Sequence, residues 1–133
     1  MIPRYKRQEI SEIWEPNNKF SIWLKIEILI CEVLAKKGKI PQRSLKKIKN
    51  KASFNINRID AIEKDVKHDV IAFLTNVAEY VGDDSRFIHK GVTSSDIIDT
   101  AFSIQLKQSC NIIKKELKDL INNLKNKALE YKN

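Results

Sequence analysis

Apolar side chains recur at helical spacing along most of the chain, and the clearest example lies between residues 18 and 37. One face of this segment holds Phe20, Trp23, Ile26, Ile30, Val33 and Leu34, and a second face holds Leu24, Ile28, Cys31 and Ala35. A helix that is apolar on two faces packs on two sides, so Trp23 is expected in the core. Asn18 is expected as the N-cap and Gly38 as the stop signal.

The chain before this helix predicts a short helix over residues 7–14. It should end before Pro16, because the residue preceding a proline is biased away from helical geometry. Arg4 and Tyr5 lie ahead of it and are expected in an extended start. An Arg beside a Tyr near a terminus carries no functional meaning by itself.

Two further helices are predicted after Gly38. Pro41 suits the first turn of the first, a thin amphipathic helix whose lysines point away from a narrow apolar stripe. That stripe consists of Leu45, Ile48 and Ala52. Asn55 and Asn57 are expected in the connection to the second helix, whose apolar positions are Ile59, Ile62 and Val66.

A fifth helix begins near Lys67-His68-Asp69 and ends at Gly82. Its apolar positions keep helical spacing and are Val70, Phe73, Leu74, Val77 and Val81. His68 then lies at the positive end of the helix macrodipole, where a neutral imidazole is favoured. A histidine there is compatible with proton transfer, and equally with an ordinary surface position beside a capping acid.

Helical periodicity resumes at Ser94 and continues almost to the end of the chain. An apolar seam with alternating spacings of four and three runs through Leu106, Cys110, Ile113, Leu117, Leu120 and Leu124. Other apolar residues extend or widen this seam, namely Ile98, Ala101, Phe102, Ile112 and Ile121. So long and regular a helix is expected to have partners, which favours a portion of a longer protein. A naturally short protein with a frayed last helix is the alternative.

The amino-acid composition limits the classes of protein to which this chain can belong. The chain has 133 residues, 42% of them hydrophobic and 32% charged, which is typical of a folded domain. No stretch approaches the roughly 20 apolar residues of a membrane span, and no secretory signal is visible, so a cytoplasmic location is expected. Cys31 and Cys110 form no metal-binding motif, and both are expected to be buried in a reducing compartment.

The net charge of +8 raises the possibility of nucleic-acid binding. Much of the excess lies in residues 36–51, which hold eight basic residues and no acid. That segment lacks the aromatic side chains on which single-stranded nucleic acids stack. Nucleic acid is therefore not the expected partner.

The start of the last helix has the composition of an anion-binding corner. Thr93 and Asp96 are spaced as a capping box, and the first turn of such a helix offers unpaired N–H groups and the positive pole of the dipole. Ser94 and Ser95 add hydroxyl donors, while His89 and the neighbouring lysine add basic groups from the preceding loop. The same residues are also compatible with a simple helix cap and solvated basic side chains.

Three stretches together carry a resemblance to a known family. The segment Arg86–Ala101, with its run Gly-Val-Thr-Ser-Ser-Asp, resembles the first signature region of the adenylosuccinate lyases, in the fumarase/aspartase superfamily. Arg4-Tyr5 and Lys67-His68-Asp69 agree with that family in order and spacing. The resemblance implies an all-α fold: a helical amino-terminal domain over residues 1–93, and over residues 94–133 the start of a long helix leading to a central bundle.

The resemblance also implies an activity. Adenylosuccinate lyases eliminate fumarate from adenylosuccinate to give AMP, and cleave the succinylated aminoimidazole carboxamide ribonucleotide of purine biosynthesis, without a metal or organic cofactor. By resemblance, Thr93 and Ser94 hold the succinyl portion of this nucleotide substrate, and Arg4 and Tyr5 hold its nucleotide end. The residues implied between them are Lys67, His68 and Asp69. His89 is implied at the phosphate.

His68 is the residue of this chain that the resemblance implies for proton transfer or for orienting the leaving group. A second essential histidine and a serine base occupy later motifs of the family, which these 133 residues do not contain. The family works as a homotetramer that shares its sites between subunits, so this chain alone is expected to be inactive. One departure is Val66, where many relatives carry Thr.

Two other functions remain open at this point. The first is a non-enzymatic helical module that binds nucleic acid or another acidic partner through residues 36–51. The second is a different lyase of the superfamily, acting on argininosuccinate or fumarate. Arg4-Tyr5 and Lys67-His68-Asp69 fit the purine enzyme better than this second alternative.

Overall fold

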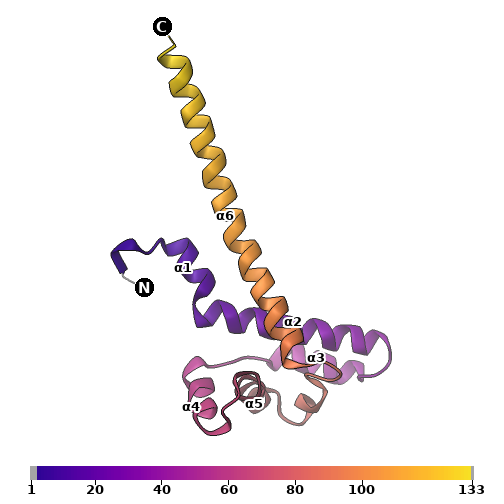
Figure 1. The fold of residues 1–133 in the computed structure, drawn as a ribbon. Coiled ribbons are helices and arrows are strands. Elements are labelled where there is room, and N and C mark those ends of the chain that lie inside the picture. The colour runs from indigo at the N-terminus through magenta and orange to yellow at the C-terminus, as the bar shows by residue number, and fades with distance from the viewer. Residues whose placement is uncertain (1–2, 133) are drawn as a thin grey trace.

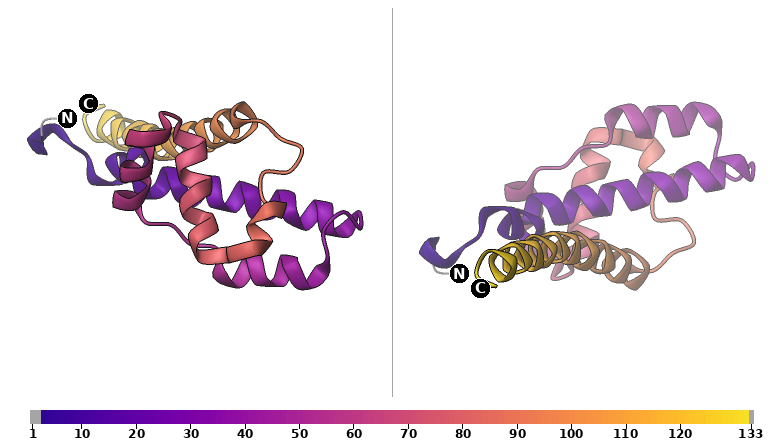
Figure 2. Two further views of the ribbon diagram at one scale, coloured as in Figure 1. Left: turned by 90° about the horizontal axis from the view of Figure 1, so that it is seen from below. Right: turned by 90° about the horizontal axis from the view of Figure 1, so that it is seen from above.

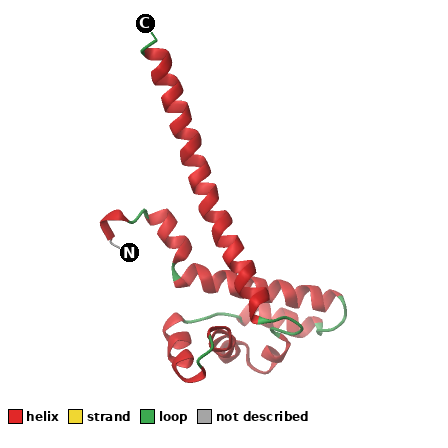
Figure 3. Ribbon diagram, viewed as in Figure 1, coloured by secondary structure: helices red, strands yellow, loops and turns green. Residues whose placement is uncertain are grey.

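The computed structural model describes residues 3–132, which are helical with short connections and contain no strand (Figures 1 and 3). The helices are α1 (Gln8–Trp14), α2 (Pro16–Lys36), α3 (Gln42–Lys51), α4 (Ile56–Val66), α5 (Asp69–Val81) and α6 (Ser94–Glu130). Two short 3-10 segments are η1 (Pro3–Tyr5) and η2 (Gly82–Phe87). The predicted all-α class is confirmed. Within the described part of the chain, no helix is both long and apolar enough to cross a membrane.

Helix α2 lies at the centre of the molecule. In Figure 1, α3, α4 and α5 lie below it, and α6 begins beside it and rises away; Figure 2 gives the same arrangement from below and above. Phe20 and Phe73 stack with ring centroids 5.6 Å apart, and Trp23 packs edge-on against both rings. All three side chains are buried. This aromatic cluster ties α2 to α5 and confirms that Trp23 is a core residue.

The buried residues of helix α6 all lie in its first half. At about 1.5 Å per residue its 37 residues extend for about 55 Å, and its second half projects beyond the other helices (Figure 1). The buried positions recur every fourth residue and are Ile97, Ala101, Gln105 and Ser109. Gln105 donates from Nε2 to the carbonyl oxygen of Ile13 in α1 at 2.7 Å.

The upstream part of the predicted apolar face is buried at Ala101, whereas the seam from Leu106 to Leu124 lies beside the buried positions. Its side chains from Leu106 to Leu124 are exposed, with Leu124 60% exposed. Cys110 belongs to the same face and is also exposed, so the expectation that both cysteines are buried is correct only for Cys31. The periodicity predicted an apolar stripe correctly, but Gln105 and Ser109 provide part of the intrachain contact instead.

Several helix boundaries differ from the expected ones. Helix α2 begins at Pro16, and Asn18 is not its N-cap: its side-chain amide donates to the carbonyl of Ile13 at 2.8 Å. Arg4 and Tyr5 form a 3-10 turn instead of an extended segment.

The connection before α4 is also shorter than expected. Asn55 is the N-cap of α4, and its side chain accepts a hydrogen bond from the backbone N–H of Arg58. Asn57 therefore lies inside the helix. Pro41 precedes α3 directly, as the residue before its first turn.

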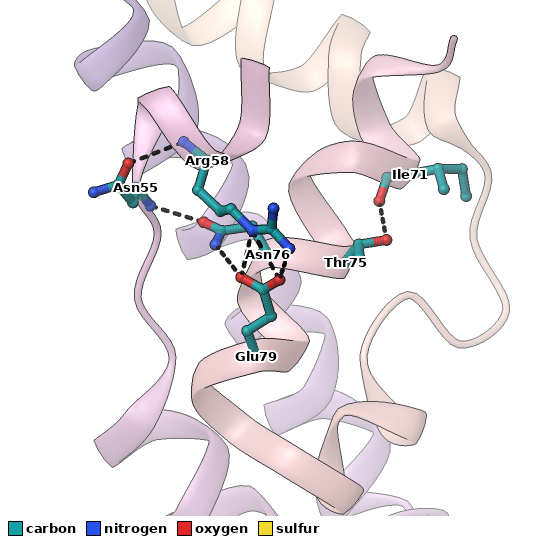
Figure 4. A network of polar contacts seen from close by, with 6 residues as sticks. All are labelled: Asn55, Arg58, Ile71, Thr75, Asn76 and Glu79. Carbon is teal, nitrogen blue, oxygen red and sulfur yellow. Dashed lines mark hydrogen bonds and ion pairs between the residues drawn. The ribbon is translucent and has the colours of Figure 1, made fainter. Parts of the chain in front are cut away.

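A polar network joins the start of α4 to α5 (Figure 4). Asn76 is buried, its side-chain oxygen accepts from the backbone N–H of Asn55 at 2.7 Å, and its amide donates to Glu79 at 3.0 Å. Arg58 donates to the same glutamate at 2.6 Å. Because a buried polar group without a partner is costly, Asn76 fixes the α4–α5 hairpin, which carries Lys67 to Asp69 at its turn.

Replacing Asn76 with alanine should lower the free energy of unfolding by about 1–3 kcal/mol, because the backbone N–H of Asn55 loses its buried acceptor. The measurement is urea denaturation followed by circular dichroism. Thr75→Ala is the matched control: Thr75 is exposed and bonds only to the carbonyl of Ile71 in its own helix (Figure 4). Equal stability of the two variants would contradict a structural role for the network.

Candidate functional site

The start of α6 contains the capping box that the sequence predicts. Thr93 is the N-cap and forms a capping box with Asp96, whose carboxylate accepts from the backbone N–H of Thr93 at 2.7 Å. Ser94 opens the helix and is half-buried, while Ser95 is exposed. Gly91, with φ of 79°, turns the loop into the helix. The hydroxyls and the helix N–H groups can therefore meet a carboxylate or phosphate from solvent.

His89 precedes this helix start and is held by a buried acid of α2. Its backbone N–H donates to Glu27 Oε2 at 2.9 Å, and its Nδ1 lies 2.6 Å from Glu27 Oε1. Glu27 is 1% exposed, and the imidazole is largely covered. Among residues 3–132, Nε2 of the same ring has no hydrogen-bond partner, which leaves it as the ring nitrogen that can meet a ligand.

His68 lies at the start of another helix. It is the N-cap of α5, and its Nδ1 accepts from the backbone N–H of Ile71 at 3.4 Å. Lys67 ends α4 in the left-handed conformation with φ of 54°, which lets the chain reverse between the two helices. Asp69 accepts from the backbone N–H of Val70 at 2.7 Å. An imidazole that accepts at Nδ1 carries its proton at Nε2 in the neutral form, so His68 presents a donor to solvent.

Arg4 and Tyr5 occupy a separate place. Both are exposed, and the Arg4 guanidinium lies 4.9 Å from the centroid of the Tyr5 ring. The following helix is tied to α6 by Arg7, which donates to Glu116 at 2.8 Å. At about 1.5 Å per residue, Glu116 lies about 33 Å along α6 from Ser94. A single chain therefore does not bring Arg4 and Tyr5 to Thr93 and Ser94.

The predicted site residues thus fall into three groups. His89, Thr93 and Ser94 share one loop and helix start, whereas Lys67, His68 and Asp69 share the α4–α5 turn. Arg4 and Tyr5 form the third group. No hydrogen bond among the described residues joins one group to another.

Sequence reasoning missed Glu27. The signal was present, because an acid stands between Trp23 and Cys31 on an apolar side of the predicted helix. It also missed a polar hollow of about 640 Å³ between α3 and η2, lined by Arg43, Lys47, Asp83, Asp84 and Arg86. Lys47 donates to Asp84 there and holds the pKa of that carboxyl below its ordinary value. Within residues 3–132, no cluster of His, Cys, Asp and Glu side chains has the geometry to hold a metal ion.

Comparison with known proteins assigns the family. Residues 4–133 match the protein family described as Lyase. This chain belongs to the lyase family. Relatives called adenylosuccinate lyase, from Bacillus subtilis and from a Synechocystis species, are each 47% identical over 99% of the chain, and one from Staphylococcus saprophyticus is 44% identical. The chain spans 31% of the length of each of these relatives.

Solved structures of other lyase-fold enzymes share the architecture. A fumarate lyase from Mesorhizobium superposes with a TM-score of 0.78 at 18% identity, covering 86% of this chain and 28% of that one. A β-carboxy-cis,cis-muconate cycloisomerase from Acinetobacter calcoaceticus superposes with a TM-score of 0.69 at 22% identity, covering 84% and 28%. At these identities the likeness establishes the fold alone. It agrees with the predicted helical fold.

The link between Arg7 and Glu116 should depend on pH. The hydrogen bond and charge of Arg7 lower the pKa of Glu116 from its ordinary value of 4.5. A lowered pKa means that the contact stabilises the α1–α6 arrangement above about pH 4.5 and is lost as pH falls through the shifted pKa. Trp14 packs edge-on against Phe102 of α6 at 5.9 Å, so its fluorescence should report this loss.

The control for that titration is Glu116→Gln. Glu15, whose pKa is lowered chiefly by its hydrogen bond with Lys6, titrates in the same range and remains in both proteins. The fluorescence difference between parent and variant should therefore vanish at acid pH and appear as pH rises through the lowered pKa of Glu116, below 4.5. A difference that is constant with pH would contradict the assignment to Glu116.

Proposed function

We propose that this chain is the amino-terminal portion of an adenylosuccinate lyase, which eliminates fumarate from adenylosuccinate to give AMP. The same enzyme would cleave the succinylated aminoimidazole carboxamide ribonucleotide in purine biosynthesis. The observation that carries the proposal is the 47% identity, over 99% of the chain, to relatives called adenylosuccinate lyase. The grouping of the family's residues at two helix starts supports it.

The chemistry of the elimination fits these two helix starts. Removal of a proton from the carbon beside a carboxylate builds negative charge on that carboxylate, and preorganised donors stabilise such charge with little reorganisation. Thr93 and Ser94, with the first N–H groups of α6, supply such donors for the succinyl portion. No metal or organic cofactor takes part in the proposed reaction.

The departing nitrogen needs a proton, and His68 is the proposed donor or orienting group. Its Nδ1 is engaged by the backbone of α5, which leaves Nε2–H for the substrate. Lys67 and Asp69 flank it at the same turn and are proposed to line the substrate. His89 is proposed at the phosphate.

The assembly of this site is proposed to need other copies of the chain. Arg4 and Tyr5 would bind the nucleotide end of a substrate held by Thr93 and Ser94 of a different subunit, since one chain leaves them far apart. The exposed seam of α6 would pack in the central bundle of a homotetramer. A cytoplasmic location belongs to the same proposal.

The 133-residue chain by itself should show no adenylosuccinate cleavage, because the later histidine and serine motifs of the family are not among its residues. Fumarate release is followed in a steady-state assay with purified chain, and a full-length adenylosuccinate lyase serves as the positive control. Turnover within tenfold of that control would refute this part of the proposal.

In the full-length lyase, His68→Gln should lower kcat by about 100-fold or more, the usual effect of removing a general acid or base. Glutamine keeps the polarity of the position, and circular dichroism with sedimentation checks that fold and assembly are retained. Thr75→Ala on the same helix is the matched control and should keep parental kinetics. Unchanged kinetics in His68→Gln would remove His68 from the site.

A further inference from the structure

Glu27 is a buried carboxylate for which the proposed site has so far given no role. It lies in the middle of α2, is 1% exposed, and has apolar residues of the core on either side of it in the helix. A buried carboxylate is costly unless it is paired and hydrogen-bonded. Its presence therefore requires a specific partner, and the structure provides one from the loop that leads to α6.

Both oxygens of Glu27 meet the same residue. Oε2 accepts from the backbone N–H of His89 at 2.9 Å, and Oε1 lies 2.6 Å from His89 Nδ1. A carboxylate can only accept, so Nδ1 is the donor in this pair. His89 has a φ of 60°, a left-handed conformation that is uncommon for a residue other than glycine. The two bonds therefore hold the backbone and the ring of His89 together.

A second contact from α2 reaches the same loop. Cys31, one turn beyond Glu27, donates from Sγ to the carbonyl oxygen of Phe87 at 3.6 Å. Burial, followed by the negative charge of Glu27, raises the pKa of the Cys31 thiol to about 11, so it remains a thiol that can donate. Helix α2 thus fixes the loop at Phe87 and at His89, on either side of Ile88.

We infer that Glu27 is a positioning residue for substrate binding: by fixing Nδ1 and the backbone of His89, it presents Nε2 of that ring to the phosphate of the nucleotide. This inference rests on the proposed function, which assigns His89 to the phosphate. Glu27 itself is buried and does not touch the substrate. Replacing Glu27 should therefore weaken the binding of phosphate-bearing ligands, and it should do so only by displacing His89.

The experiment is a double-mutant cycle in the full-length enzyme with Glu27→Gln, His89→Gln and the double variant. Glu27→Gln should raise KM for adenylosuccinate about tenfold, the effect of losing one charge-assisted hydrogen bond, with kcat within about twofold of the parent. The inhibition constant of AMP should rise in parallel, whereas that of fumarate, which has no phosphate, should not change. The double variant should match His89→Gln alone, because the two residues act as one unit.

Glu32→Gln is the matched control. Glu32 lies on the same helix and pairs with Lys49 at the surface at 2.7 Å, so its replacement should leave all constants unchanged. If Glu27→Gln does not fold, Glu27→Asp carries the same cycle, since it keeps the charge but is too short to reach both groups of His89.

Three results would overturn the inference while the proposed function stands: an unchanged KM in Glu27→Gln, equal changes in the AMP and fumarate constants, or KM effects that add in the double variant. Additive effects would mean that Glu27 stabilises the fold without acting through His89. Failure of the parental full-length enzyme to cleave adenylosuccinate would instead refute the proposed function, and this inference with it.

Discussion

The burial of α2 on both sides is the constraint on which the other elements depend. Its Phe20 and Trp23 pack against Phe73 of α5, and α6 begins against it and rises away (Figure 1). Because Glu27 lies on a part of α2 that other elements cover, its side chain cannot turn to solvent. Glu27 must then find its partner within the protein, and the loop before α6 supplies His89. The same packing that forms the core thereby places the start of α6.

The helices were predictable because apolar spacing reflects burial, but their ends were less so. Asn18 has the residue type of an N-cap, yet Pro16 fits the first turn of α2, and the Asn18 amide is used in a contact with Ile13. The seam of α6 was identified correctly as apolar, but periodicity cannot tell which of two faces is covered within one chain. Gln105 and Ser109 are buried on the other face through tertiary contacts that a hydrophobic pattern does not register.

The positions of the candidate site residues could be predicted where they lie at helix starts, because capping is local in sequence. Thr93 is the N-cap of α6, as its capping-box spacing indicated, and His68 lies at the start of α5, as expected, where it is the N-cap. Glu27 was missed for the opposite reason, since its partner lies 62 positions away in the chain. Arg4 was assigned by resemblance, which gives a role but no distance, and only the structure separates it from the start of α6.

Under the proposed function, the separation of Arg4 from the start of α6 and the exposed apolar seam of α6 both indicate that the site needs a second copy of the chain. Under the proposed function, a substrate held at Thr93 is also bound by Arg4 at its nucleotide end. This chain anchors the neighbouring Arg7 at Glu116, about 33 Å from Ser94 along a rigid helix. A helix cannot bend enough to close such a distance within one molecule. A second copy packed along the exposed leucines can close it, because neighbouring helices in a bundle lie about 10 Å apart. The apolar face that stabilises the assembly would then be the same feature that completes the site.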